Sequence, residues 1–171
     1  MDILETKHHA ILSQSERDNS PHTDGLRLCF ELLSTARMID QSCAKRLAPY
    51  QLSESRFVIL FLLHQEPVGI APHLLAERAG ITRATLTGLL DGLERDGFIQ
   101  RNHSETDRRS ITITLTDKGA QTASSLSLEH TQWIASLMTS LSAQEMQIFS
   151  QLLTKIWASA QGQSGHDQSA N

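Results

Sequence analysis

The sequence predicts a mainly α-helical protein that carries a small β-hairpin wing, and two stretches of the chain support this fold class. Residues 74–103 have the pattern of a helix, a turn, a second helix and a strand. In residues 107–119, Ile111, Ile113 and Leu115 alternate with polar residues, the period-two pattern of a half-buried strand. Together these segments predict a winged helix-turn-helix DNA lobe, and the remaining helices are expected to form a helical dimerisation lobe.

The chain as a whole is acidic. Its formal net charge is -4 over 171 residues, a length that suits one domain with a sizeable core. A nucleic-acid-binding protein is expected to show a basic footprint, so any such surface must be segregated from acidic regions. Residues 82–109 hold five arginines against five acidic residues, a neutral balance. Affinity for DNA would therefore rest on individual placed arginines and on the avidity of a dimer.

The composition favours a cytoplasmic protein. There is no run of 18 apolar residues and no basic segment leading into an apolar one at the N-terminus, so we expect neither a transmembrane helix nor a secretory signal. The two cysteines, Cys29 and Cys43, fall on one predicted helix and would lie about 21 Å apart at 1.5 Å per residue. An intrachain disulfide is impossible at that distance, which suits a reducing cytoplasm.

The N-terminal part of the chain divides at about residue 24. Residues 1–23 are polar and are expected to form a mobile arm, with a short helical turn around residues 3–12. The histidines of the arm are interpreted as solvated rather than as a metal site, since no partner cluster is visible: His8, His9 and His22. A helix is predicted over residues 24–48, capped by Asp24 and ended by Pro49.

Turn and cap residues mark the helix boundaries between residues 53 and 80. Ser53 suits the N-cap of a second helix that is so apolar that it should be buried all round, as the floor of the core. Residues 68–70 are short enough for a single edge strand. Pro72 suits the first position of a third helix, and Gly80 supplies the turn that follows it.

The fourth predicted helix begins after Thr82, its N-cap. Leucines at i, i+3, i+4 and i+7 give it an inward face: Leu86, Leu89, Leu90 and Leu93. At about 100° per residue, the opposite face carries small, hydroxylated or charged residues: Ala84, Thr87, Gly88, Asp91 and Arg95. We expect Asp91 and Arg95 to pair, because they are four residues apart. Such a face leaves room for close approach to the floor of a DNA groove.

The hairpin is expected at residues 98–102 and 110–115, and a helix follows from about residue 117 to 140. Ser142 and Glu145 have the spacing of a capping box ahead of the last helix.

Domain boundaries follow from these elements. The folded domain is expected at residues 24–159, with the DNA lobe at about 53–116 and the dimer lobe at about 24–48 and 117–159. Residues 160–171 are rich in polar and small residues and predict a disordered tail.

Two features of the DNA lobe predict contacts to DNA. The second helix of a helix-turn-helix lies in the major groove, and helix N-termini bind phosphates through backbone N–H groups. Arginine is the usual reader of the minor groove, so a hairpin tip with two arginines suits insertion there. Asp107 could hold one of them extended through a charge-assisted hydrogen bond. The candidate DNA-binding residues are Thr82, Arg83, Ala84, Thr85, Thr87, Gly88, Asp107, Arg108 and Arg109. The alternative is that Thr82 serves only as a cap and that the other threonines are simply solvated.

The segments LLAERAGITRATLTGLLDGLERDGFIQR and TDRRSITITLTDKG resemble the MarR (multiple antibiotic resistance regulator) family of bacterial regulators, over about residues 26–157. The family's wing pattern, Asp, any residue, Arg, falls on Asp107 and Arg109. The resemblance implies a winged-helix homodimer whose first, fifth and sixth helices form the dimer lobe. It also implies a palindromic double-stranded DNA operator, usually repression, and often release by a small phenolic or aromatic acid.

A ligand pocket between the two lobes is implied by the same resemblance. Pockets favour apolar walls with a few polar anchors, so the candidates by helix position are Arg27, Phe30, His64 and Trp133. Arg27 or His64 could meet a carboxylate. For each residue the alternative is core packing or an ordinary surface charge.

Cys29 lies in a Leu-Cys-Phe context that resembles the sensor of the family's organic-peroxide-sensing branch. In that branch, tyrosines 14 and 25 residues further on bond to the cysteine; here those positions are Cys43 and Glu54. Thiol-based redox sensing is therefore an alternative to a ligand, and the other interpretation places Cys29 in the core.

Other functional classes find little support. No nucleophile motif, glycine-rich phosphate loop or H-E-x-x-H motif is present, so we predict no enzyme, no metal site and no cofactor. A winged-helix module that binds proteins instead of DNA is the competitor from another class, and it would have no reason to keep an arginine-bearing wing.

Overall fold

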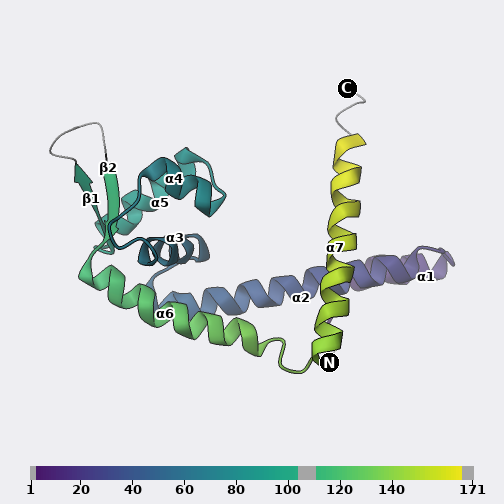
Figure 1. The fold of residues 1–171 in the computed structure, drawn as a ribbon. Coiled ribbons are helices and arrows are strands. Elements are labelled where there is room, and N and C mark those ends of the chain that lie inside the picture. The colour runs from purple at the N-terminus through teal and green to yellow at the C-terminus, as the bar shows by residue number, and fades with distance from the viewer. Residues whose placement is uncertain (1–2, 104–110, 167–171) are drawn as a thin grey trace. The chain divides into compact units, whose positions relative to one another are not determined.

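A computed structural model describes residues 3–103 and 111–166 of the chain (Figure 1). This part is mostly helical with one antiparallel hairpin, which confirms the predicted fold class. Its elements are α1 (Thr6–Arg17), α2 (Thr23–Leu47), a 3-10 turn (Ala48–Tyr50), α3 (Glu54–His64), α4 (Pro72–Ala79), α5 (Arg83–Arg95), β1 (Ile99–His103), β2 (Ile111–Leu115), α6 (Asp117–Ser136) and α7 (Ala143–His166). The chain divides into two compact units, residues 1–123 and 124–171, and the boundary falls within α6.

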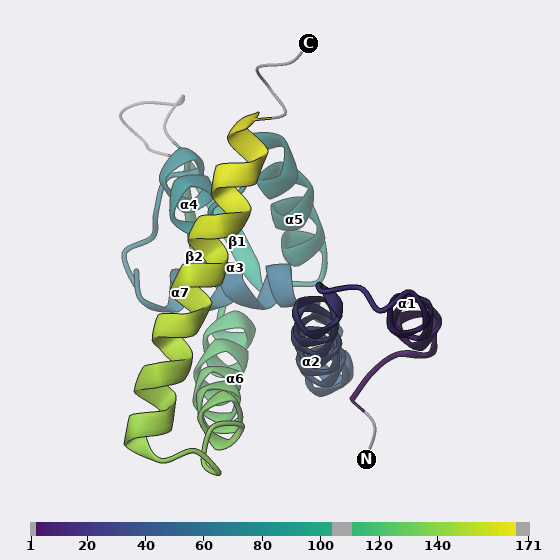
Figure 2. The ribbon, with the colours of Figure 1, turned by 90° about the vertical axis from the view of Figure 1, so that its right-hand side faces the viewer.

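Residues 6–17, which the sequence predicts to be part of a mobile arm, form the helix α1 and pack beside α2; Figure 2 shows the two helices end-on. Leu12 is 2% exposed, and the ring of His8 stacks on that of Phe30 with centroids 4.2 Å apart. Arg37 also donates to both carboxylate oxygens of Glu5, at 3.2 and 3.0 Å. The mostly polar helix α1 is therefore held against α2 by a few contacts, among them the buried side chain of Leu12 and the stacked ring of His8.

The start of α2 also differs from prediction. Asp24 lies in its first turn, and the N-cap position is His22, whose side chain makes no capping hydrogen bond. The helix ends at Leu47, just before the turn that contains Pro49, as predicted.

The core of the first unit lies beneath the helix-turn-helix. Its largest fully buried side chains come from α2, α3, α4, α5 and β2: Leu47, Ile59, Leu60, Leu63, Leu75, Leu86, Leu93 and Ile113. The hydroxyl of Ser53 accepts from the backbone N–H of Arg56, so Ser53 caps α3 as predicted. Pro72 opens α4, and Gly80 after it has a φ of 65°, a left-handed conformation that suits glycine.

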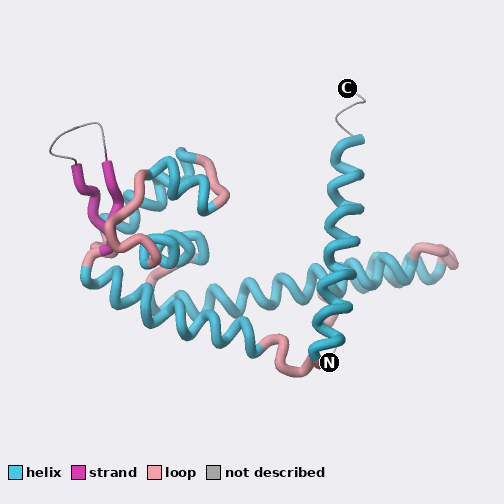
Figure 3. Tube along the Cα trace, in the orientation of Figure 1, coloured by secondary structure: helices cyan, strands magenta, loops and turns pink. Residues whose placement is uncertain are grey.

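The wing is a two-stranded hairpin, coloured magenta in Figure 3. In its register, Ile99 lies opposite Leu115 and Arg101 opposite Ile113. Ile70 forms a single bridge to Ile113, so the predicted edge strand is reduced to one paired residue. Just before it, Gly69 passes over β2 so closely that a Cβ there would lie 2.4 Å from Cγ2 of Thr112.

The C-terminal helices depart from prediction at their ends. Helix α6 ends at Ser136, and α7 runs to His166, so residues 160–166 are helical where a disordered tail was predicted. The capping box is confirmed: the backbone N–H of Ser142 donates to Glu145, and the backbone N–H of Glu145 donates to the Ser142 hydroxyl. Within residues 3–103 and 111–166, none of the helices has the length and apolar character needed to cross a membrane.

Candidate nucleic-acid interface

Helix α5 has one buried face and one exposed face, divided as the sequence predicts except that Leu89, expected to face inward, is only half-buried. Leu86, Leu90 and Leu93 are at most 2% exposed and pack inward. The outward residues are all exposed: Ala84, Thr87, Gly88, Asp91 and Arg95. At Gly88 a Cβ would meet nothing within 4 Å, so the backbone itself is open to an approaching partner.

Hydroxyl groups gather at the N-terminus of α5. Thr82 accepts from the backbone N–H of Thr85 at 3.1 Å, and the two hydroxyls lie 2.9 Å apart. The Thr87 hydroxyl donates to the backbone carbonyl of Arg83 at 2.9 Å. This bond uses the hydroxyl proton of Thr87, so the oxygen that faces solvent is available as an acceptor. The first turn thus presents hydroxyl oxygens, the backbone N–H groups that precede Thr85, and the partial positive charge of a helix terminus.

The charges on α5 differ from prediction in one pairing. Asp91 bonds to Arg101 on β1, at 2.6 Å, and not to Arg95. Arg95 instead lies 3.6 Å from the carboxylate of the following residue, Asp96. A strand residue that reaches back to the helix therefore replaces the expected helix-surface pair. Among the described residues, Arg83 makes no side-chain hydrogen bond or ion pair, so its charge is available to a ligand.

A second ion pair supports the turn that ends α5. Arg56 of α3 donates to Asp96 at 2.5 Å, and this hydrogen bond holds the pKa of the Asp96 carboxyl below its ordinary value, although burial opposes the shift. Lys118 of α6 donates to the backbone carbonyl of Asp96 at 2.7 Å, and its ammonium lies 4.2 Å from the centre of the Phe98 ring. The end of α5 is therefore tied to both α3 and α6.

The tip of the wing lies outside the described residues. Asp107, Arg108 and Arg109 belong to residues 104–110, so their predicted DNA contacts remain predictions. The strands that carry the tip are described, and Asn102 donates to the Thr114 hydroxyl across them at 2.8 Å.

The candidate ligand residues have separate surroundings within their own units, and none of them lines a described cavity. Arg27 bonds to Glu16 of α1 at 2.5 Å, and Phe30 is covered by the ring of His8. His64 is exposed at the end of α3. Trp133 belongs to the second unit, where its ring meets that of His130 edge-on.

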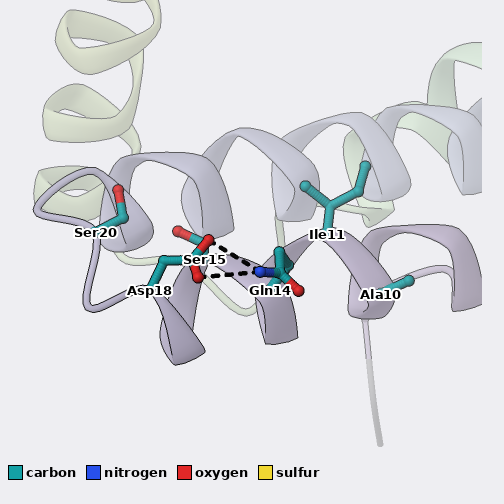
Figure 4. Close-up of a pocket in the computed structure, with 6 residues that line it drawn as sticks. All are labelled: Ala10, Ile11, Gln14, Ser15, Asp18 and Ser20. Atoms are coloured by element: carbon teal, nitrogen blue, oxygen red, sulfur yellow. Dashed lines mark hydrogen bonds between the residues drawn. The ribbon is translucent and has the colours of Figure 1, made fainter.

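An open depression of about 540 Å³ lies on the surface of α1 and the turn after it. It is lined by Ala10, Ile11, Gln14, Ser15, Asp18 and Ser20, and none of these is a predicted site residue (Figure 4). In its wall, the amide of Gln14 donates to both carboxylate oxygens of Asp18 at 3.0 Å.

The two cysteines have different surroundings. Cys29 is exposed, so the interpretation of this residue as part of the core is wrong within this chain. Cys43 is buried, and burial raises the pKa of its thiol, so it is the cysteine of the core.

Arg101 is the residue of this interface that sequence reasoning missed. The available signal was its position two residues after Ile99, which puts both side chains on the same face of β1. As for metals, no group of three or more His, Cys, Asp or Glu side chains within the described ranges could hold an ion.

Comparison with known proteins extends this description. A family model described as the MarR family matches residues 52–111. The HTH-type transcriptional repressor YetL of Bacillus subtilis (strain 168) is 33% identical over 148 residues, 86% of this chain and 89% of its own length. The HTH-type transcriptional regulator PecS of Dickeya dadantii (strain 3937) is 32% identical and covers 70% of this chain and 73% of its own.

Two solved structures with bound DNA share the fold. Streptococcus pneumoniae FabT in complex with DNA has a TM-score of 0.67 at 22% identity, over 80% of this chain and 96% of its own. The S. aureus MepR-DNA complex has a TM-score of 0.65 at 22% identity, over 75% of this chain and 94% of its own.

Proposed function

This chain belongs to the MarR family of transcriptional regulators that bind DNA, and we propose that it is a sequence-specific repressor that acts as a homodimer. YetL, a repressor by name, is similar to it over most of both chains, which favours repression over activation. We further propose that it works in the cytoplasm as a regulator and not as an enzyme, as its regulator relatives suggest.

The observation that carries this proposal is the exposed face of α5. Its first turn offers hydroxyl oxygens, N-terminal backbone N–H groups and the guanidinium of Arg83, which has no side-chain partner among the described residues. Small residues at Ala84 and Gly88 leave room for a groove floor. These groups suit major-groove binding, in which backbone contacts fix the register and side chains on the exposed face read base edges. The wing residues Asp107, Arg108 and Arg109 would add a minor-groove contact.

A gel shift with the region upstream of the chain's own gene tests this function. Binding to that duplex at a concentration at least about a thousandfold below that for an unrelated duplex is expected of a specific regulator. Equal binding to both duplexes, or none to either, would contradict it. The second outcome would favour the winged-helix protein-interaction module.

Apolar side chains on α7 support the homodimer. Phe149, Leu152 and Ile156 recur along one side of the helix and are 41%, 48% and 44% exposed. An unpartnered apolar stripe of this kind marks a protein–protein surface. Two symmetric recognition helices would then meet half-sites of a palindromic operator about 10 base pairs apart.

For the effector we propose a small aromatic or phenolic acid. Arg27, Phe30, His64 and Trp133 remain candidates for its site, supported by helix position and by the family resemblance. To accept a carboxylate, Arg27 would have to exchange its bond with Glu16 for one to the ligand. A thermal-shift screen of aromatic acids and phenols, followed by the gel shift with any compound that stabilises the protein, tests this proposal. A screen in which no compound both stabilises the protein and releases DNA would contradict it.

Redox sensing by Cys29 is the alternative mechanism, and the exposure of this thiol favours it over a purely structural role. Under the ligand mechanism, Cys29→Ser still represses and still responds to the natural inducer. If Cys29→Ser binds the operator but loses induction by every agent that induces the parent, Cys29 is the sensor.

A further inference from the structure

Arg101 occupies an unusual place for a charged residue. It lies on β1 two residues from Ile99, which is 2% exposed and packs in the core. Because alternate residues of a strand share a face, Arg101 is on the inner side of the hairpin, and its side chain is only 28% exposed. Its guanidinium therefore reaches the neighbouring helix α5.

The guanidinium holds two carboxylates of α5 at once. One terminal nitrogen lies 2.6 Å from the carboxylate of Asp91, and the other lies 2.9 Å from that of Glu94. Asp91 and Glu94 are three residues apart and so are neighbours on the helix surface. Arginine suits this bridge because its planar fork offers separate donors with a fixed separation.

These carboxylates stand beside the surface proposed to meet DNA. Asp91 follows Thr87 by four residues on the exposed face, and its side chain is 59% exposed. A carboxylate in that place repels phosphate oxygens unless a cation compensates it. Without Arg101, the C-terminal half of the reading face would present Asp91 and Glu94 together.

We propose that Arg101 is a positioning residue for DNA binding: it bridges Asp91 and Glu94, offsets one of their two negative charges, and fixes the recognition helix to the wing strand without contacting DNA itself. Both terminal nitrogens already bond to carboxylates of α5, so the positive charge of Arg101 is offset within the protein, whereas no described residue offsets that of Arg83. The inference rests on the proposed function, since it requires α5 to face the duplex.

Affinity for the operator and for an unrelated duplex, measured at two salt concentrations, tests the proposal. Arg101→Gln is expected to weaken binding to both duplexes by about tenfold at low salt, and by less at high salt, because uncompensated surface charges are screened. The double variant Arg101→Gln, Asp91→Asn restores the charge balance of the cluster, so it is expected to bind within about threefold of the parent.

A matched control separates this local effect from net charge. Asp24 is exposed on α2, so Arg101→Gln, Asp24→Asn has the same net charge as the rescued variant but leaves Asp91 uncompensated. It is expected to bind as weakly as Arg101→Gln alone. Equal rescue by Asp24→Asn and Asp91→Asn, or no rescue by Asp91→Asn, would overturn the proposal and make Arg101 a direct contact or a purely structural residue.

Unchanged affinity of a folded Arg101→Gln would also overturn it. If Arg101→Gln does not fold, Arg101→Lys replaces it as the test variant. A single lysine ammonium cannot bridge both carboxylates as the planar guanidinium does. Arg101→Lys is then expected to bind DNA more weakly than the parent, and adding Asp91→Asn is expected to restore the affinity. If Arg101→Lys alone binds like the parent, the proposal is refuted. Failure of the parent itself to bind any duplex would instead refute the proposed function.

Discussion

Gly119, in the first turn of α6, approaches the backbone of Phe98 so closely that a Cβ on Gly119 would lie 1.9 Å from the Phe98 carbonyl oxygen. The same Cβ would lie 3.3 Å from the Leu115 side chain. Thr116 completes the junction, because its hydroxyl donates to the carbonyl of Gly97 and accepts from the N–H of Gly119. The base of the wing and the start of α6 therefore meet through backbone atoms with no room for a side chain.

Gly119→Ala is accordingly expected to destabilise the protein by about 1–3 kcal/mol, because the helix or the strand must shift to admit the methyl group. Urea unfolding monitored by circular dichroism measures the loss. The matched control is Gly25→Ala in α2, where a Cβ meets nothing within 4 Å. In that helix alanine is expected to be neutral or to stabilise by up to about 1 kcal/mol. Equal stability of Gly119→Ala and the parent would contradict the close approach.

The ion pair between Arg56 and Asp96 gives a pH dependence. The hydrogen bond from Arg56 lowers the pKa of Asp96 in the folded state. The ion pair therefore contributes its full stabilisation above the unfolded-state pKa of about 3.9, and this stabilisation is lost as the pH falls through the lower folded-state pKa. The difference in unfolding free energy between the parent and Asp96→Asn should therefore be largest near neutral pH and shrink below about pH 4. Urea titrations from pH 7 to pH 3 measure it, and a difference that stays constant would contradict this assignment.

Much of the DNA lobe follows from local sequence signals. Ser53, Thr82 and Gly80 have side-chain or backbone preferences that act within one turn of the chain, and the structure confirms each of them. The leucine spacing of α5 likewise predicts its buried face.

Features that depend on contacts between residues far apart in the sequence could not be predicted from local patterns. Helix α1 is held by its contacts with α2, such as the stack of His8 on Phe30, and no local pattern announces them. Asp91 could choose between Arg95 on its own helix and Arg101 on the strand, and only the packing of β1 against α5 decides the choice.

The apolar stripe of α7 predicts the oligomeric state. Leu152→Glu places a charge in the middle of that stripe, so the variant is expected to be a monomer in multi-angle light scattering at concentrations where the parent is a dimer. Gln147→Glu is the control, since about 100° per residue puts it on the other side of α7. A dimeric Leu152→Glu would show that the dimer interface lies elsewhere.

Removing an arginine from the tip of the wing is expected to weaken DNA binding without unfolding the protein. Arg109→Ala is expected to weaken operator binding by about 1–3 kcal/mol for each half-site, while its thermal midpoint and dimeric state stay unchanged. Titration at fixed salt measures the affinity. Arg17→Ala removes the same charge from α1, far along the chain from the wing, and should bind like the parent. An Arg109→Ala variant that also binds like the parent would remove the wing from the interface.

The central claim is that the exposed face of α5 reads base sequence, and selection from a random duplex library tests it most directly. Thr87→Ala and Thr85→Ala are expected to change the preferred bases in each half-site, because both side chains are exposed in the turn of α5 that precedes the open backbone at Gly88. Arg83→Gln should keep the same preference and bind all duplexes more weakly, with the salt slope reduced by about one unit for each phosphate that Arg83 no longer neutralises. Unaltered base preference in both threonine variants would contradict the claim and leave α5 with only a positioning role.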